Sequence, residues 1–193
     1  DLKVGLADDH EWMGGASMAQ NGVICNPNIP SEEVFTTPHA LRVEGYVSST
    51  KPLSHQGTLI DNIRVVFEKG SITDAKASKG ETVLKKVLES DEGARRLGEV
   101  ALVPNSSPIS NSGLLFYNTL FDENAACHIA LGQCYSKCFK GETNLSTSEI
   151  RERGGNSSMI HIDWMIGSGE IDIDGFGKNG EIAPIFRKGE WVD

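Results

Sequence analysis

The chain has 193 residues, of which 38% are hydrophobic and 23% charged, and its formal net charge is −9. This length suits one sizeable domain with its own hydrophobic core. No apolar stretch approaches the about 20 residues that a membrane-spanning helix requires, so a membrane protein is not expected. The acidic balance argues against nucleic acid or anionic lipid as the main partner, because both require a basic surface.

The first part of the chain reads mainly as β-strands. A short strand is expected at residues 2–6, and VEGYVSS (43–49) alternates well enough for another. NIRVVFEKGSITDAKA (62–77) contains two β-rich runs around Gly70, which supplies the turn. This pattern predicts an antiparallel hairpin.

In the middle of the chain, the pattern of apolar residues predicts two main helices with a strand between them. Ser78 opens a segment with capping-box spacing and apolar residues at helical intervals, so a helix that ends near Ser90 is expected. The apolar run 99–103 is expected to be a strand, which Pro104 ends. DENAACHIAL (122–131) is interpreted as the second helix, with its aspartate near the start.

The last part of the chain returns to β-structure. One short helix is expected at 147–152, followed by the strand MIHIDWMI (159–166). EIDIDG (170–175) and EIAPIFRKGEWV (181–192) predict a closing set of antiparallel strands. The predicted fold class is therefore α+β, with a strand-rich mixed or antiparallel sheet and two main helices.

Four cysteines, Cys25, Cys127, Cys134 and Cys138, bear on the compartment. Three of them lie within twelve residues, and this spacing is poorly suited to disulfides that cross-link distant segments. All four cysteines are therefore interpreted as reduced thiols. A cytoplasmic location is therefore expected. A zinc site formed by the last three cysteines and His128 is a weaker alternative, because their spacing lacks a tight CxxC pair.

His161 and Asp163 lie two residues apart in an otherwise apolar strand. Side chains at i and i+2 of a strand point to the same face, so Ile162 and Trp164 take the opposite face. An imidazole beside a carboxylate suits zinc, cobalt or manganese better than calcium or magnesium. The alternative is a structural pair in which the histidine bonds its neighbouring aspartate on a solvated face.

A second group of polar residues falls within and after the segment interpreted as a helix. His128 and Tyr135 are seven residues apart, so they would share one face of a continuous helix. Glu123 would lie in the first helical turn, where the helix dipole favours a carboxylate. The alternative is a core helix whose histidine and tyrosine are satisfied by ordinary hydrogen bonds.

Further carboxylates flank two apolar segments. Glu32 and Glu33 follow a proline-bounded loop, and Glu99 heads an apolar strand, where an unpaired carboxylate is costly to desolvate. Surface salt bridges at strand ends are the alternative. If these groups converge with the histidines, they would suffice to hold two divalent ions.

Four motifs resemble those of the thermophilic-type metallo-aminopeptidase family. They are NPNIPSEEVFTTP, LGEVALVP followed by SPIS, LFDENAACHIALG, and HIDWMIGSGEIDIDG. The similarity runs along nearly all of the chain, in the same order, and matches the C-terminal, metal-carrying half of that family. Residues 1–193 are therefore expected to form the catalytic domain, without the N-terminal domain of full members.

The resemblance implies metal-dependent removal of N-terminal residues from peptides, with site residues carried over by motif. Glu33 would be a ligand, with Glu32 the less favoured choice, and Asp163 would bridge two ions. Glu99 would be a bridging or base-like carboxylate, and Tyr135 would stabilise the transition state, which makes these two the expected catalytic residues. The implied metal ligands are Glu33, Glu99, Glu123, His128, His161 and Asp163.

The resemblance also implies two divalent cations, a peptide substrate with a free N-terminus, and a homodimer. This ligand set would accept zinc, cobalt, manganese or magnesium, in different degrees. Two other interpretations stay open: a non-catalytic metal-binding fragment without turnover, and a β-rich interaction module whose histidines merely pack. His10, His39 and His55 are expected to have only structural roles in loops or at the surface.

Overall fold

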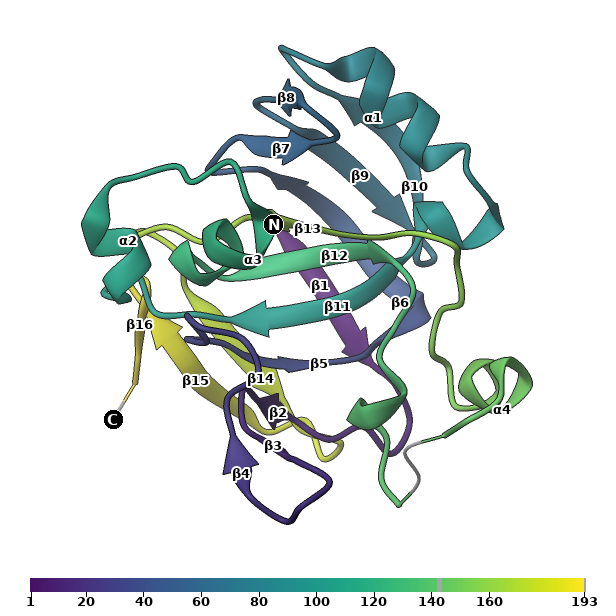
Figure 1. Ribbon diagram of the computed structural model, residues 1–193. Coiled ribbons are helices and arrows are strands. Elements are labelled where there is room, and N and C mark those ends of the chain that lie inside the picture. The colour runs from purple at the N-terminus through teal and green to yellow at the C-terminus, as the bar shows by residue number, and fades with distance from the viewer. Residues whose placement is uncertain (142–143, 193) are drawn as a thin grey trace.

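Antiparallel β-sheet dominates the computed structural model, which describes residues 1–141 and 144–192. A four-stranded sheet has the order β1-β6-β9-β10, and a five-stranded sheet has the order β13-β12-β11-β5-β2 (Figure 1). The first sheet consists of β1 (Leu2–Leu6), β6 (Pro38–Ser48), β9 (Arg64–Glu68) and β10 (Ser71–Lys76). The second consists of β2 (Met13–Gly14), β5 (Val34–Thr36), β11 (Leu97–Leu102), β12 (His128–Gly132) and β13 (His161–Met165).

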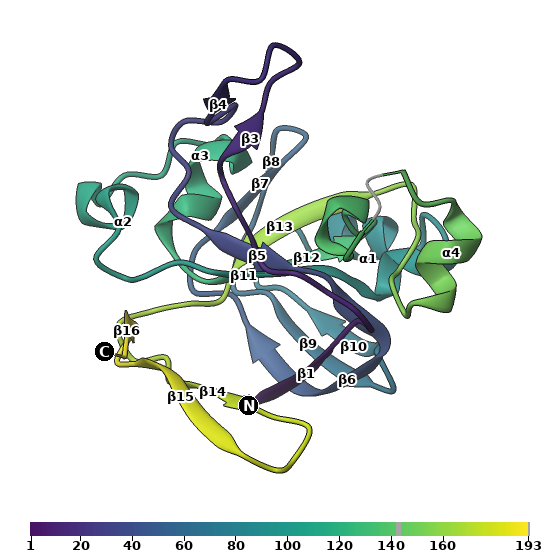
Figure 2. The ribbon, with the colours of Figure 1, turned by 90° about the horizontal axis from the view of Figure 1, so that it is seen from below.

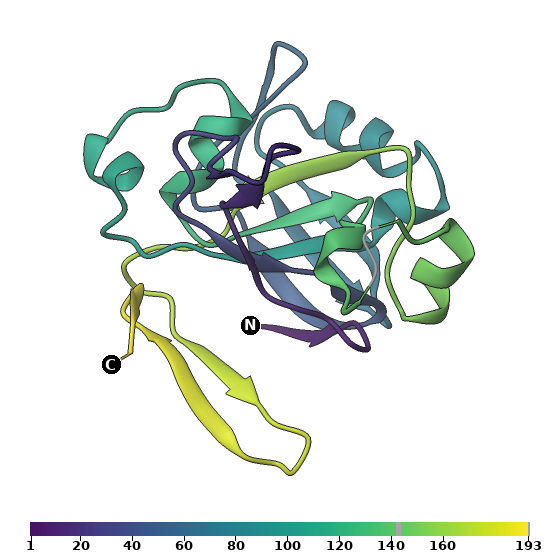
Figure 3. The ribbon, with the colours of Figure 1, turned by 60° about the horizontal axis from the view of Figure 1, so that its bottom comes forward.

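Three smaller β-units complete the strands. The pairs are β3 (Ser17–Met18) with β4 (Ile24–Cys25), and β7 (Leu53–His55) with β8 (Thr58–Ile60). The closing three-stranded sheet consists of β14 (Ile173–Phe176), β15 (Ile182–Arg187) and β16 (Glu190–Trp191). Figures 2 and 3 show that the β14–β15 hairpin extends away from the two larger sheets.

The helices are short and lie around the sheets. The α-helices are α1 (Glu81–Leu88), α2 (Pro108–Ser112), α3 (Thr119–Asp122) and α4 (Thr147–Glu152). The 3-10 turns span Glu92–Arg95, Glu123–Ala125 and Ser136–Cys138. None of these helices is long and apolar enough to cross a bilayer, as judged over the described ranges.

The predicted α+β class, the hairpin around Gly70 and the first main helix are confirmed, but the second main helix is wrong. Residues 122–131 contain the end of α3, a 3-10 turn and the strand β12. Every residue of β12 is buried. Its sequence therefore shows no alternation of apolar and polar residues that would distinguish a strand from a buried helix. Pairing with β11 and β13 decides the outcome, and His128 and Tyr135 therefore do not share a helix face.

The main hydrophobic core lies between the two large sheets and below α1. One face of the five-stranded sheet contributes its apolar side chains to this core, and they are Leu97, Ile129, Leu131 and Trp164. The facing sheet and α1 contribute Val43, Val65, Phe67, Leu84 and Leu88. Because side chains alternate between the two faces of a strand, the opposite face of the five-stranded sheet can carry side chains that are not apolar.

A β-bulge at Gly98 changes which side chains of β11 face the core. The register of β11 against β12 shifts between Leu97, which pairs with Leu131, and Glu99, which pairs with Ala130. In a regular strand the two residues would point to the same face, but the extra residue reverses this. Leu97 consequently enters the core while Glu99 points to the opposite face.

Replacing Gly98 with alanine is expected to lower the free energy of unfolding by about 2–4 kcal/mol, because the bulge leaves no room for a Cβ atom. An added Cβ would lie 2.3 Å from the Gln133 carbonyl oxygen and 2.4 Å from that of Gly132. Urea unfolding measures the change. Gly14→Ala is the matched control, since a Cβ there meets nothing within 4 Å. Equal effects of the two substitutions would contradict this account of the bulge.

Candidate metal centre

Carboxylates and imidazoles gather on the face of the five-stranded sheet that is turned away from the core. His128 begins β12, while His161 and Asp163 lie in β13, two residues apart and on one face as expected. Glu99 reaches this face through the bulge, and Glu33 comes directly before β5. These four segments are distant in the chain but adjacent in the sheet, and each contributes at least one polar side chain to the cluster.

The polar atoms form two groups that share one residue. His128 Nε2 lies 3.0 Å from Glu33 Oε2 and 3.6 Å from Glu99 Oε1. His161 Nε2 lies 3.6 Å from Glu99 Oε2 and 3.3 Å from Asp163 Oδ1. Within each group the possible ligand atoms lie within 4.8 Å of one another. The two oxygens of the Glu99 carboxylate therefore face one histidine each.

Backbone carbonyls fix the orientation of both imidazole rings. His128 Nδ1 donates to the carbonyl oxygen of Ala126 at 3.1 Å, and His161 Nδ1 donates to that of Gln133 at 2.7 Å. A carbonyl oxygen can only accept, so the proton of the neutral ring sits on Nδ1. The lone pair on Nε2 then points at the carboxylates, which is the arrangement of metal-binding histidines in proteins.

Two atoms at the centre of the cluster lack a hydrogen-bond partner. Glu33 Oε2 and His128 Nε2 are buried and face each other at 3.0 Å, and with the His128 proton on Nδ1 neither atom has a donor within the described part of the chain. Buried polar groups are nearly always satisfied, so such orphaned atoms require an explanation. A divalent cation fits this donor set of imidazole nitrogens and carboxylate oxygens. Neither group contains a cysteine, so among residues 1–141 and 144–192 no set of possible ligands supports the cysteine zinc site.

The electrostatics of the cluster also favour a cation. Burial raises the pKa of the Glu99 carboxyl, and the nearby charges of Asp163 and Glu33 raise it further. Burial, with Asp163 next in effect, raises the pKa of Glu123 to about 8. Burial alone would lower the pKa of His161, but the hydrogen bond and charge of Asp163 raise it to about 9. Without a cation the cluster therefore retains protons, which a cation would displace.

Glu123 and Tyr135 border the cluster without belonging to either group of possible ligands. Glu123 lies in the 3-10 turn after α3 and is 8% exposed. The Tyr135 ring centroid lies 4.7 Å from that of His161 and 5.8 Å from that of Phe35. Burial and the surrounding carboxylates raise the pKa of the Tyr135 phenol. The hydroxyl therefore stays protonated and able to donate a hydrogen bond.

Asn124, which belongs to one of the family motifs but was assigned no role there, supports the segment that carries Glu33. The buried Asn124 side chain accepts a hydrogen bond from the Glu32 backbone N–H at 2.7 Å and donates to the Leu120 carbonyl. Through this contact Asn124 anchors the segment before β5, whereas the Glu32 side chain itself is exposed. Sequence reasoning missed Asn124, because a contact between residues 92 positions apart leaves no local signal.

An antiparallel α+β domain that gathers imidazoles and buried carboxylates on one sheet face defines a candidate metallohydrolase. The chain belongs to the thermophilic metalloprotease (M29) family, whose model matches residues 1–191. This finding confirms the resemblance drawn from the sequence motifs.

Individual members of the family are similar in sequence to this chain over its whole length. Aminopeptidase T of Thermus aquaticus is 55% identical over 192 residues, and aminopeptidase AmpS of Bacillus subtilis is 50% identical over the same number. The structure of wild-type AmpT from Thermus thermophilus superimposes with a TM-score of 0.95 at 53% identity. It is covered over 47% of its length and this chain over 100%. The chain thus spans about half the length of the relatives it matches.

Proposed function

We propose that residues 1–193 form the metal-carrying catalytic domain of an aminopeptidase that removes N-terminal residues from peptides. The observation that carries this proposal is the sharing of Glu99 by two groups of possible metal ligands. Relatives that match the whole chain carry aminopeptidase names, which supports the reaction class. The other half of their length would correspond to an N-terminal domain.

Two divalent cations are proposed at the cluster. Three residues, Glu33, Glu99 and His128, would hold one ion, and the other would lie between Glu99, His161 and Asp163. Glu123 is the proposed sixth ligand, because it lines the same pocket as His161 and Asp163. Zinc, cobalt, manganese and magnesium are the ions that this donor set admits.

The surrounding side chains would then perform amide hydrolysis. When bound, the cations would supply a water of lowered pKa and would polarise the scissile carbonyl. With one of its oxygens released from its cation, the Glu99 carboxylate would accept a proton from the attacking water and pass it to the leaving amine. The protonated Tyr135 hydroxyl donates a hydrogen bond to the developing oxyanion. The acidic residues around the site favour a cationic α-amine, which would restrict cleavage to the first peptide bond.

Metal analysis followed by a peptidase assay tests this function. The purified chain is expected to bind about two ions. It is further expected to release the first residue of unblocked peptides in a chelator-sensitive manner. An N-acetylated copy of the same peptide is the control, since it lacks the α-amine and is expected to resist cleavage. Binding without turnover, with turnover restored in a longer chain, would instead favour a non-catalytic fragment.

Two further properties belong to this proposal. A homodimer is expected from the family resemblance, and analytical ultracentrifugation tests it. The free thiols of Cys25, Cys127, Cys134 and Cys138 suit a reducing compartment, which supports a cytoplasmic location.

Replacing Tyr135 with phenylalanine is expected to lower kcat about 100-fold to 1,000-fold, because it removes one donor to the oxyanion. KM and metal content are expected to change little, since the ring and its packing on His161 remain. Steady-state kinetics with matched metal analysis measures both quantities. Tyr46→Phe is the control, because Tyr46 lies on β6 and packs near Arg64. A variant with unchanged kcat would exclude this role of the Tyr135 hydroxyl.

A further inference from the structure

The loop at residues 133–140, which follows β12, folds back over the face of the sheet that carries the candidate metal centre. Its Cys138 side chain packs against Phe35 and Ala101. Ala101 pairs with Phe35 on one side and with His128 of the cluster on the other, and directly paired residues share a face of a sheet. The side chains of this loop therefore lie on the same face as the cluster.

Buried hydrogen bonds fix the backbone of this loop. The hydroxyl of the buried Thr37 donates to the Tyr135 carbonyl oxygen at 3.4 Å and is also hydrogen-bonded to the thiols of Cys134 and Cys138. The Cys138 backbone N–H donates to the same Tyr135 carbonyl at 3.1 Å. The main chain at Tyr135 is thus held in place, and the orientation of its side chain has to be set by other contacts.

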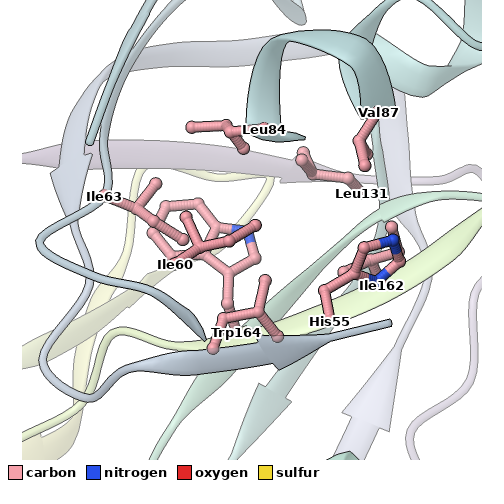
Figure 4. Close-up of a pocket in the computed structure, with 9 residues that line it drawn as sticks. His55, Ile60, Ile63, Leu84, Val87, Leu131, Ile162 and Trp164 are labelled. Carbon is pink, nitrogen blue, oxygen red and sulfur yellow. The ribbon is translucent and has the colours of Figure 1, made fainter. Parts of the chain in front are cut away.

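The Tyr135 ring lies against firm structure on one side and is open to solvent elsewhere. Its centroid lies 4.7 Å from that of His161, whose strand packs against the core from behind. There Ile162 and Trp164 of β13 line a cavity of only about 10 Å³ below α1, which is room for about one water molecule (Figure 4). The strand is therefore closely packed, whereas Tyr135 itself is 42% exposed.

Lys137 provides a charged contact to this exposed ring. Its ammonium nitrogen lies 5.3 Å from the Tyr135 ring centroid and 4.7 Å from that of Phe35, within the distance of about 6 Å that cation–π attraction requires. The two rings meet edge to face at 63°, so one ammonium group contacts both. The strongest charges acting on the Tyr135 phenol are those of Glu99 and Asp163, and the field of these carboxylates attracts an ammonium group to this position.

We propose that Lys137 is a positioning residue, whose ammonium group holds the Tyr135 ring in the orientation from which the hydroxyl donates to the oxyanion. The inference rests on the proposed aminopeptidase function and adds a residue to its transition-state stabilisation. Lys137 acts through Tyr135 and touches no reacting atom. A tyrosine ring without this contact would present its hydroxyl correctly in a smaller fraction of molecules, and the rate would fall with that fraction.

Lys137→Met tests this role, because it keeps a long side chain and removes the charge. The value of kcat is expected to fall about 2-fold to 5-fold, as for the loss of one exposed cation–π contact, while KM and metal content stay unchanged. Lys137→Arg is expected to keep about the wild-type kcat, since a guanidinium group also stacks on aromatic rings. Lys140→Met is the matched control, because Lys140 is exposed in the same loop and its ammonium group lies over no aromatic ring of the described residues.

The same substitution in a Tyr135→Phe background separates positioning from other roles. That background lacks the hydroxyl, so Lys137→Met is expected to leave its kcat unchanged. An equal fall in both backgrounds would overturn the proposal, because Lys137 would then act on something other than the hydroxyl. An unchanged kcat of Lys137→Met in the otherwise wild-type chain would overturn it as well.

Fluorine NMR gives a readout that does not depend on turnover. The chain has three tyrosines, so protein labelled with fluorotyrosine is expected to give three signals, and that of Tyr135 is identified by its loss in Tyr135→Phe. Lys137→Met is expected to shift this signal towards that of free fluorotyrosine, whereas Lys140→Met leaves it in place. An active enzyme whose Tyr135 signal does not move in Lys137→Met would overturn the positioning role alone. A moved signal without peptidase activity in any metal would overturn the proposed function and leave Lys137 as a packing contact of the ring.

Discussion

Replacing Glu99 with glutamine is expected to abolish the binding of both cations and to lower kcat/KM by about 10,000-fold. One oxygen of its carboxylate faces His128 and the other faces His161, so the substitution removes a ligand from both groups at once. Glu33→Gln removes a ligand from one group only, and about one ion per chain is expected to remain. Metal analysis of the two variants, with kinetics on the same samples, measures these effects.

Glu32→Gln is the control for both substitutions. Glu32 is adjacent to Glu33 but is exposed and belongs to neither ligand group, so metal content and activity are expected to match the wild type. A Glu99→Gln protein that still carries two ions would contradict the sharing of Glu99.

The metal-free form of Glu99→Gln distinguishes a ligand role from a structural one. Glu99 is 4% exposed, and burial raises its pKa, so its charge is costly when no cation offsets it. Without metal, the variant is therefore expected to be about 1–3 kcal/mol more stable than the wild type. With metal, the order is expected to reverse. A purely structural carboxylate would stabilise the protein under both conditions.

Local signals in the sequence predicted the elements whose pattern is complete within a short segment. The β9–β10 hairpin turns at Gly70 and α1 follows Gly80, because turn chemistry and helical spacing act over a few residues. The prediction of a helix over the residues of β12 was wrong for the opposite reason. All its residues are buried between β11 and β13, so only these neighbours distinguish a strand from a helix there.

The candidate site shows the same division between local and distant information. Strand alternation alone places His161 and Asp163 on one face. No local pattern brings Glu33 to His128, and the family motifs were needed to expect their convergence. The bulge at Gly98 was not visible in the sequence, although it turns Glu99 from the core face to the site face. The family resemblance thus identified the site residues, while the sheet pairing and the bulge explain why their side chains meet.

Removing the bound cations is expected to lower the melting temperature by about 10–20 °C. A ligand at 100 times its Kd stabilises the folded state by about 2.7 kcal/mol per site, so two sites contribute about 5 kcal/mol. For a chain of this length each kcal/mol corresponds to about 2–4 °C. Thermal unfolding with and without chelator measures the shift. Glu99→Gln is the control, because chelator is expected to leave its melting temperature unchanged.

The effect of chelation is also expected to grow with pH. In the metal-free protein the pKa of Glu123 is raised from 4.5 to about 8, and that of His161 is raised from 6.5 to about 9. A group whose pKa is raised by folding contributes stability at low pH and loses that contribution as the pH rises through the raised value. The metal-free protein should thus become less stable between pH 5 and pH 9, over the interval that these two groups define. Cations displace the same protons, so the gap in melting temperature between loaded and chelated protein should widen over that interval. A gap that stays constant would mean that the carboxylates and imidazoles satisfy one another without a cation.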